Sequence, residues 1–252
     1  MSASVLLIYT GGTIGMLADP RTGAMRPMDL AHLEEQVPEL ERVGVRLGAT
    51  AFEQPIDSSD MRPADWVRIA RIIGDRYHEF DGFVVLHGSD TMAYTASALS
   101  FLLEGLTKPV ILTGSQLPIG TIRTDAKENL ITAIEVAAAM DEQGRAMVPE
   151  VAVYFEYRLM RGNRTVKVHA ERFEAFRSPN WPALAEAGVH LRYDRSAILP
   201  NRSGPLKVHE RVDACVGVIR LFPGITAEWV RHALGTPGLS AVLLTTFGSG
   251  NG

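Results

Sequence analysis

The sequence predicts an α/β protein: a large N-terminal domain on a doubly wound, mostly parallel sheet, then an incomplete smaller α/β C-terminal domain. Apolar runs of strand length, typical of strands buried on both faces, alternate with helical patterns along most of the chain. Small polar residues follow these runs, as expected where parallel strands open onto a ligand site. The 252 residues, of which 46% are hydrophobic, can bury one large core and part of a second.

The first elements are a strand, a loop and a helix. Val5–Ile8 is an unbroken apolar run of strand length. Leu17–Pro27 is rich in Asp, Pro, Arg, Thr and Gly, which is typical of a surface loop that can act as a lid beside a site. Apolar residues at helical spacing over 66–73 follow Pro63, and proline is favoured in the first turn of a helix.

Strands and helices then alternate. The expected order is strand Asp81–Leu86, helix Met92–Glu104, strand Pro109–Thr113, helix Ala126–Met140 and strand Val151–Phe155. Gly105 would end the first of these helices and Asp125 would cap the second, because glycine and aspartate are preferred at those positions. This alternation predicts a parallel sheet.

The domain boundaries follow from a change of pattern late in the chain. We expect a catalytic domain over residues 1–192, a linker over 193–210 and a partial second domain over 211–252. The last part contains a strand, a helix and a strand, at Cys215–Leu221, Thr226–Leu234 and Leu239–Thr246. One such unit cannot cover both faces of its own sheet, so the sequence predicts a truncated chain with exposed apolar surface at this end.

Charge and cysteine content exclude several classes of protein. The net charge is −4 and no long basic run is present, so nucleic acid is not an expected partner. Val5–Ile8 is too short for a signal or membrane segment, and no basic region precedes it. The single cysteine, Cys215, excludes an internal disulfide and lies in an apolar run, where we expect it in the core. These features predict a cytoplasmic protein without membrane contact.

Side chains able to do chemistry gather where the predicted strands end. Thr13 lies in the glycine-rich turn Tyr9–Met16, which matches neither the dinucleotide fingerprint nor the Walker loop. Ser89 and Asp90 stand at the start of a helix, where capping and catalysis are both open as roles. Lys167 falls in a loop beyond another strand end, and we expect it on the same rim.

Four more polar residues, Asp57–Asp60, end an extended segment, and helix capping explains only one or two of them. The rim thus offers hydroxyls, a carboxylate and an amine, a set that suits acyl transfer with a hydroxyl nucleophile and an amine base. The serine-hydrolase motif Gly-x-Ser-x-Gly is absent, and the seven histidines show no metal-ligand spacing. We therefore expect no metal and no cofactor, and interpret His87 as a hydrogen-bonded structural residue.

Several motifs make the chain resemble the bacterial-type asparaginases, in particular their cytoplasmic type I branch. The two most specific motifs are Thr-Gly-Gly-Thr-Ile-Gly-Met at residues 10–16 and His-Gly-Ser-Asp-Thr-Met at residues 87–92, in that order. The similarity covers almost the whole chain and includes Asp57–Met61, Thr113–Gln116, Arg161–Thr165, Ser178–Asn180 and Phe247–Gly252. The resemblance implies further elements after the last one seen here, and a homodimer or homotetramer at full length.

The resemblance also implies hydrolysis of L-asparagine to L-aspartate and ammonia through a threonine acyl-enzyme. Thr13 matches the family's first catalytic threonine. Ser89, Asp90 and Lys167 match the threonine, aspartate and lysine of a second catalytic group. Threonine is usual where Ser89 stands. Many relatives carry a loop tyrosine that orients the nucleophile, and it is missing here near Met25.

Substrate recognition is implied by the same match. Ser58, Ser59 and Asp60 match the segment that binds the α-carboxylate of the substrate. Ser89 and Asp90 also belong to the substrate site, and Asp90 would receive the α-ammonium. Alternatives remain open: glutaminase activity, the ammonia-releasing amidase subunit of a tRNA-dependent amidotransferase, and an inactive asparagine-binding fragment or sensor.

Overall fold

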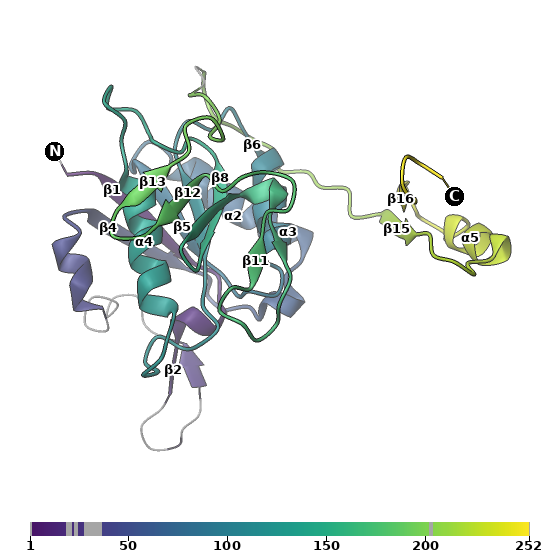
Figure 1. Ribbon diagram of the computed structural model, residues 1–252, viewed down its shortest axis with the longest axis horizontal. Coiled ribbons are helices and arrows are strands. Elements are labelled where there is room, and N and C mark those ends of the chain that lie inside the picture. The colour runs from purple at the N-terminus through teal and green to yellow at the C-terminus, as the bar shows by residue number, and fades with distance from the viewer. Residues whose placement is uncertain (1, 19–21, 23–24, 28–36, 202–203, 252) are drawn as a thin grey trace. The chain divides into compact units, whose positions relative to one another are not determined.

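The computed structural model describes residues 2–18, 22, 25–27, 37–201 and 204–251 (Figure 1). The chain separates into two compact units, Met1–Glu210 and Arg211–Gly252. Among the described residues, no helix is long and apolar enough to cross a membrane.

The larger unit is built on an eight-stranded sheet with the strand order β13-β12-β9-β8-β7-β5-β1-β4. Neighbouring parallel strands are β8 (Val151–Phe155), β7 (Val110–Thr113), β5 (Gly82–Leu86), β1 (Ser4–Tyr9) and β4 (Arg46–Ala51). Antiparallel strands extend one edge, namely β9 (Arg158–Arg161), β12 (Ala185–Ala187) and β13 (Leu191–Tyr193). This mostly parallel sheet confirms the predicted fold class.

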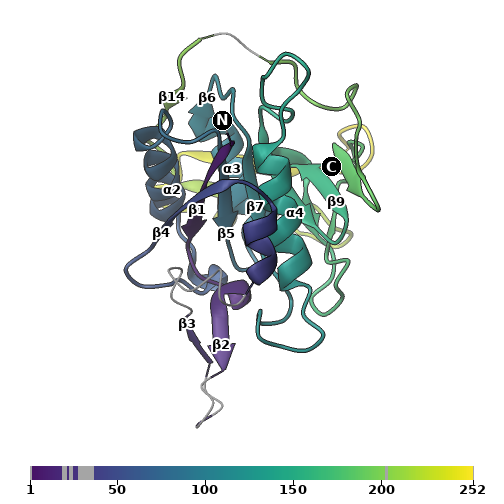
Figure 2. The ribbon, with the colours of Figure 1, turned by 90° about the vertical axis from the view of Figure 1, so that its left-hand side faces the viewer.

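Helices cover both faces of the sheet (Figure 2). On one face, α2 (Pro63–Asp75) and α3 (Met92–Leu102) pack in a core with Leu6 and Ile8 of β1. On the other face, α4 (Ala126–Ala138) packs in a second core with Val5 and Leu7. Successive side chains of a strand point to opposite faces, so a strand between two helical layers must be apolar at every position. This explains the unbroken apolar run in β1.

Two helices end earlier than the sequence predicts. α3 stops at Leu102 because Leu103–Glu104 forms β6, which pairs with β14 (Lys207–Val208). α4 stops at Ala138, and Met140 forms an isolated bridge with Ala146. Pairing with other segments replaces the last helical turn in both places, and helical periodicity alone does not reveal such partners.

Short elements complete the larger unit. The described part of the loop predicted at 17–27 is a ribbon of β2 (Met16–Ala18) and β3 (Met25–Pro27), and residues 19–21 and 23–24 lie outside the described residues. β10 (Val166–Lys167) pairs with β11 (Phe176–Arg177). Short 3₁₀ helices are η1 (Thr13–Gly15), η3 (Pro38–Arg42), η4 (Ser58–Asp60) and η5 (Gly162–Arg164).

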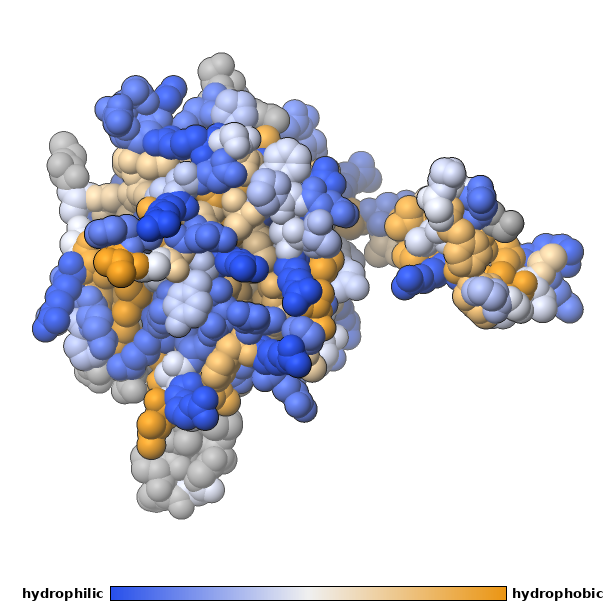
Figure 3. Space-filling model, viewed as in Figure 1, coloured by the Kyte–Doolittle hydropathy of each residue, from blue (hydrophilic) through white to orange (hydrophobic). Residues whose placement is uncertain are grey.

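The smaller unit contains β15 (Val216–Arg220), α5 (Ala227–Leu234) and β16 (Ala241–Thr245), and its two strands pair in parallel. Many of its apolar side chains are exposed, among them Val218 (68%) and Leu243 (61%), and orange surface is visible on this unit in Figure 3. The prediction that Cys215 lies in a core is wrong, because the thiol is exposed. A two-stranded sheet with one helix has little interior, and Cys215 precedes its first strand.

Candidate active site

The glycine-rich turn after β1 is tied to the end of the neighbouring strand β5. The backbone N–H and the hydroxyl of Thr10 both donate to the carbonyl oxygen of Leu86, and each donor–acceptor distance is 3.0 Å. Thr10 is completely buried, so its polar groups need these partners. The turn therefore leaves the sheet next to the loop that carries Ser89 and Asp90.

Gly11 and Gly12 let this turn pack against two other loops. Their φ angles are 136° and 88°, which residues with side chains rarely adopt. A Cβ on Gly11 would overlap the backbone of Ile56, and a Cβ on Gly12 would overlap the backbone of Gly88. Thr13 follows directly as the first residue of η1 and is half-buried. Its hydroxyl makes no hydrogen bond to another residue that the structure describes.

The loop after β4 lies in contact with the loop after β5. A Cβ on Gly88 would crowd the Ser58 hydroxyl, and the Thr91 hydroxyl donates to the carbonyl oxygen of Ser58 over 2.6 Å. Ser58 is buried, with 4% of its surface exposed, whereas Ser59 and Asp60 are exposed. The sequence-predicted carboxylate-binding segment therefore contacts the predicted catalytic loop through Ser58.

Asp57 is the residue of this segment that capping explains. It is the N-cap of η4, and its carboxylate accepts hydrogen bonds from the N–H and the hydroxyl of Ser59, both over 2.9 Å. These bonds stabilise the ionised form and lower the pKa of Asp57. Capping therefore leaves Ser58 and Asp60 available for other roles.

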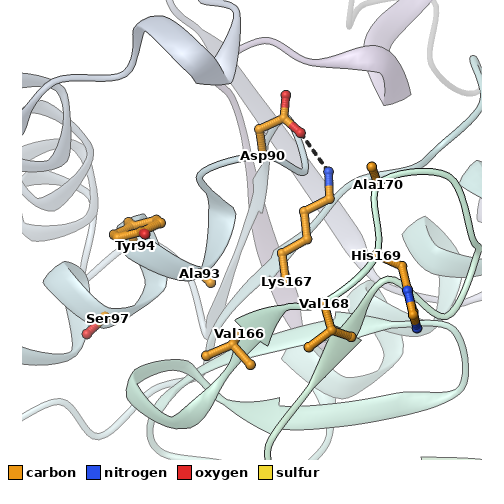
Figure 4. A pocket seen from close by; sticks show the side chains of 9 residues that line it. All are labelled: Asp90, Ala93, Tyr94, Ser97, Val166, Lys167, Val168, His169 and Ala170. Carbon is orange, nitrogen blue, oxygen red and sulfur yellow. Dashed lines mark hydrogen bonds and ion pairs between the residues drawn. The ribbon is translucent and has the colours of Figure 1, made fainter. Parts of the chain in front are cut away.

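Lys167 is in direct contact with both Ser89 and Asp90, and Figure 4 shows its ion pair with Asp90. The Lys167 ammonium lies 2.8 Å from the Ser89 hydroxyl and 2.6 Å from the Asp90 carboxylate. The Lys167 side chain is 16% exposed, whereas that of Asp90 is 62% exposed. The carboxylate of Asp90 is therefore accessible to solvent and can bind a cation there while it is paired with Lys167.

The elements that hold these three residues differ from the prediction in two respects. Lys167 does not lie in a loop after a parallel strand; it ends β10, in a hairpin with β11. Ser89 and Asp90 do not cap α3, because that helix begins at Met92 and its N-cap residue is Thr91. Their side chains are consequently free to make the contacts with Lys167.

His87 is a structural residue of the same loop. It is completely buried, with Nδ1 2.7 Å from the carbonyl oxygen of Gly88 and Nε2 2.9 Å from the Thr95 hydroxyl. Since a carbonyl only accepts, Nδ1 carries the proton of the neutral ring and Nε2 accepts from Thr95. Burial lowers the pKa of His87 from 6.5 to about 4, so the ring is neutral near pH 7.

Gln116, in the loop after β7, also reaches this site, and the sequence predicted no role for it. Its Oε1 lies 3.3 Å from the Ser89 hydroxyl. Asp125 is the N-cap residue of α4, as predicted, but its side chain makes no capping bond, because the carboxylate accepts from the backbone N–H groups of Gln116 and Leu117 instead. Only the sequence motif at 113–116 pointed to this loop.

A hollow of about 550 Å³ lies beside the Lys167–Asp90 pair (Figure 4). It is lined by α3 and by the hairpin of β10, through Asp90, Ala93, Tyr94, Ser97, Val166, Lys167, Val168, His169 and Ala170. Two of the predicted catalytic residues thus border open space large enough for an amino acid. In the part of the chain that the structure describes, no group of three His, Cys, Asp or Glu residues could hold a metal ion.

Comparison with known proteins identifies the family of this site. Residues 4–199 match the family model "Asparaginase, N-terminal". The matched range is most of the chain and includes every predicted site residue. The chain belongs to the asparaginase family. L-asparaginase 1 of Escherichia coli K12 is 45% identical over 98% of this chain, which spans 72% of that protein's length.

Two further proteins are similar to this chain, one compared as a structure and one as a sequence. The crystal structure of L-asparaginase I from Vibrio cholerae superposes with a TM-score of 0.87 at 41% identity, covering all of this chain and 74% of that one. A mouse protein named 60 kDa lysophospholipase is 43% identical over 98% of this chain, and the match spans 47% of that protein.

Proposed function

We propose that this chain hydrolyses L-asparagine to L-aspartate and ammonia through an acyl-enzyme formed on Thr13. The observation that carries the proposal is the contact of Lys167 with Ser89 and Asp90, at 2.8 and 2.6 Å, in a member of the asparaginase family. Two relatives at 45% identity are named L-asparaginase 1, which does not favour the amidotransferase alternative.

Recognition of the substrate rests on charge. The exposed carboxylate of Asp90 is suited to the α-ammonium of an amino acid, and the hydroxyl of Ser58, which Asp57 does not engage, is suited to its α-carboxylate. Since both ends of the zwitterion are then held, the side-chain amide is directed at the hydroxyls of the site. Such fixed orientation contributes a large part of the rate enhancement of enzymes.

Thr13 supplies the nucleophile. Its oxygen attacks the carbonyl carbon of the side-chain amide, the C–N bond breaks, and ammonia leaves after taking up one proton. Water then attacks the resulting ester, which releases L-aspartate and restores the Thr13 hydroxyl. This order of steps is the general scheme of covalent acyl transfer.

Ser89 and Lys167 form the proton relay of the reaction. An ammonium only donates hydrogen bonds, so Lys167 must release a proton before it can accept one from Ser89. A substrate ammonium that binds Asp90 competes with Lys167 for the same carboxylate.

The proposal also includes the setting of the enzyme. We infer that it works in the cytoplasm on a small-molecule substrate, without nucleic acid or membrane, and that at full length it is a homodimer or homotetramer. Size-exclusion chromatography with light scattering on the full-length protein tests the oligomeric state, and a single monomeric species at assay concentration would contradict it.

The test is ammonia release from L-asparagine and L-glutamine by the 252-residue chain, with Thr13→Ala as the variant and Thr236→Ala in the smaller unit as a matched control. We expect turnover of asparagine, its loss in Thr13→Ala by roughly 10³-fold or more, and no change in Thr236→Ala. Circular dichroism spectra should coincide for all three. A fully active Thr13→Ala variant, or a folded wild-type chain without turnover, contradicts the proposal.

A further inference from the structure

We propose that Gln116 is a positioning residue that fixes the rotamer of Ser89 and holds the hairpin carrying Lys167 against it. The proposal rests on the function proposed above, in which Ser89 and Lys167 act together. Its basis is a set of hydrogen bonds from one amide group to both partners of that pair.

The directions of these hydrogen bonds follow from the chemistry of the groups. As an ammonium, Lys167 can only donate, so the Ser89 hydroxyl accepts from Lys167 Nζ in this state and places its own proton elsewhere. Gln116 Oε1, 3.3 Å away, is the acceptor for that proton. The serine hydroxyl is thereby held from both sides, as acceptor on one side and as donor on the other.

The orientation of the Gln116 amide is determined by its other contacts. Nε2 donates to the carbonyl oxygens of Ala170 and Arg172, both over 2.9 Å. Carbonyl oxygens only accept, so exchanging the oxygen and nitrogen of the amide would place three acceptors face to face. Oε1 must therefore point to Ser89.

The same contacts connect Gln116 to Lys167. Ala170 and Arg172 lie in the turn between β10 and β11, which is exposed, and Lys167 is the last residue of β10. An exposed turn with few packed neighbours moves easily unless hydrogen bonds hold it. The two bonds from Gln116 Nε2 thus restrain the hairpin that positions the lysine.

Gln116 is itself held rigidly. Its backbone N–H lies 2.9 and 3.1 Å from the two carboxylate oxygens of Asp125, at the start of α4. Asp125 in turn accepts from Asn129 Nδ2 over 3.3 Å and is buried. Because its backbone is held in this way, the Gln116 side chain can hold the Ser89 hydroxyl in a fixed position.

Serine needs such a restraint because it lacks a methyl group on Cβ. A threonine has one or two preferred χ1 rotamers, whereas serine rotates among three at little cost. Without Gln116, the Ser89 side chain would rotate and its hydroxyl would lose the contact with Lys167 for part of the time. Misplacement by about 1 Å can lower a rate by roughly 10²-fold.

The experiment is a double-mutant cycle on kcat and KM for L-asparagine with Gln116→Met, Ser89→Thr and the double variant. Methionine keeps the length of the side chain but removes its hydrogen bonds. We expect Gln116→Met to lower kcat by roughly 10- to 100-fold with KM nearly unchanged. With Ser89→Thr the same change should cost less than about threefold, because the methyl group now fixes the rotamer. An equal loss in both backgrounds overturns the proposal, since a merely structural role does not depend on residue 89.

A crystal structure of Gln116→Met gives a readout that does not require turnover. We expect Ser89 in more than one rotamer in the variant and in a single rotamer in the wild type. A single, unchanged rotamer in the variant overturns the positioning role even if the wild-type chain does not hydrolyse asparagine. Gln116→Glu is a second variant, which keeps an acceptor for Ser89 but loses the bonds to Ala170 and Arg172, and it should loosen the 168–175 turn while Ser89 stays in place.

Discussion

Acidification should destabilise the fold through His87. The folded protein keeps this ring neutral, with a pKa of about 4, whereas the ordinary value for histidine is 6.5. Between pH 6.5 and about pH 4, His87 is therefore protonated in the unfolded chain and neutral in the native protein. The free energy of unfolding is highest above pH 6.5 and falls as the pH drops from 6.5 towards 4. Below pH 4, His87 lowers it no further.

The size of the effect follows from the same two values. The gap between 6.5 and about 4 corresponds to a total of about 3 kcal/mol in the free energy of unfolding. Between pH 7 and pH 5, most of the unfolded chains become protonated at His87 while the native protein stays neutral, which removes about 2 kcal/mol.

Urea unfolding at pH 7, 6 and 5, followed by circular dichroism, measures this loss in the wild type and in His87→Gln. Glutamine is neutral throughout, and its amide can donate to the Gly88 carbonyl and accept from Thr95. The other six histidines and the carboxylates contribute equally to both proteins. We expect the wild type to lose about 2 kcal/mol more than the variant between pH 7 and pH 5. Parallel losses in the two proteins would refute the reasoning.

Two further substitutions test packing, the first at the site and the second at a buried ion pair of the larger unit. Gly12→Ala forces a Cβ into the backbone of Gly88 at a φ of 88°, and should lower the free energy of unfolding by at least about 2 kcal/mol and impair ammonia release. The control Gly44→Ala, with a φ of 68° and open space, should cost only about 1 kcal/mol, and similar losses for both would show that contact with the loop is unimportant. Arg161→Met should cost about 3–5 kcal/mol, because it leaves the buried Glu150 carboxylate without the guanidinium 2.6 Å away. Adding Glu150→Gln should restore much of this, and urea midpoints that do not recover would point to lost packing instead.

The parallel strands and their carboxyl ends could be predicted from the sequence because they depend on short, local patterns. An unbroken apolar run such as Val5–Ile8 is needed only where a strand is covered on both faces, and the structure covers β1 in this way. Since parallel strands open at one rim, Thr13 and Ser89 were placed near one another without knowledge of the fold.

Other features depended on contacts between distant segments, which leave no periodic signal. Leu103–Glu104 looks like the end of a helix until its pairing with β14 is known. Asp125 is the N-cap residue of α4, but its carboxylate accepts hydrogen bonds from the loop after β7 instead of from the helix. Local propensity is a weak preference, and tertiary hydrogen bonds of this kind outweigh it.

The sequence by itself determined the α/β architecture, the glycine turn and the residue types able to carry out acyl transfer, because each depends on neighbours along the chain. Only the tertiary structure decided that Lys167 ends a hairpin strand, that Thr91 rather than Ser89 is the N-cap residue of α3, and that Gln116 contacts Ser89. The physical reason is that a hydrogen bond between side chains is set by angstrom-scale positions of separate loops, and those positions follow from packing of the whole sheet.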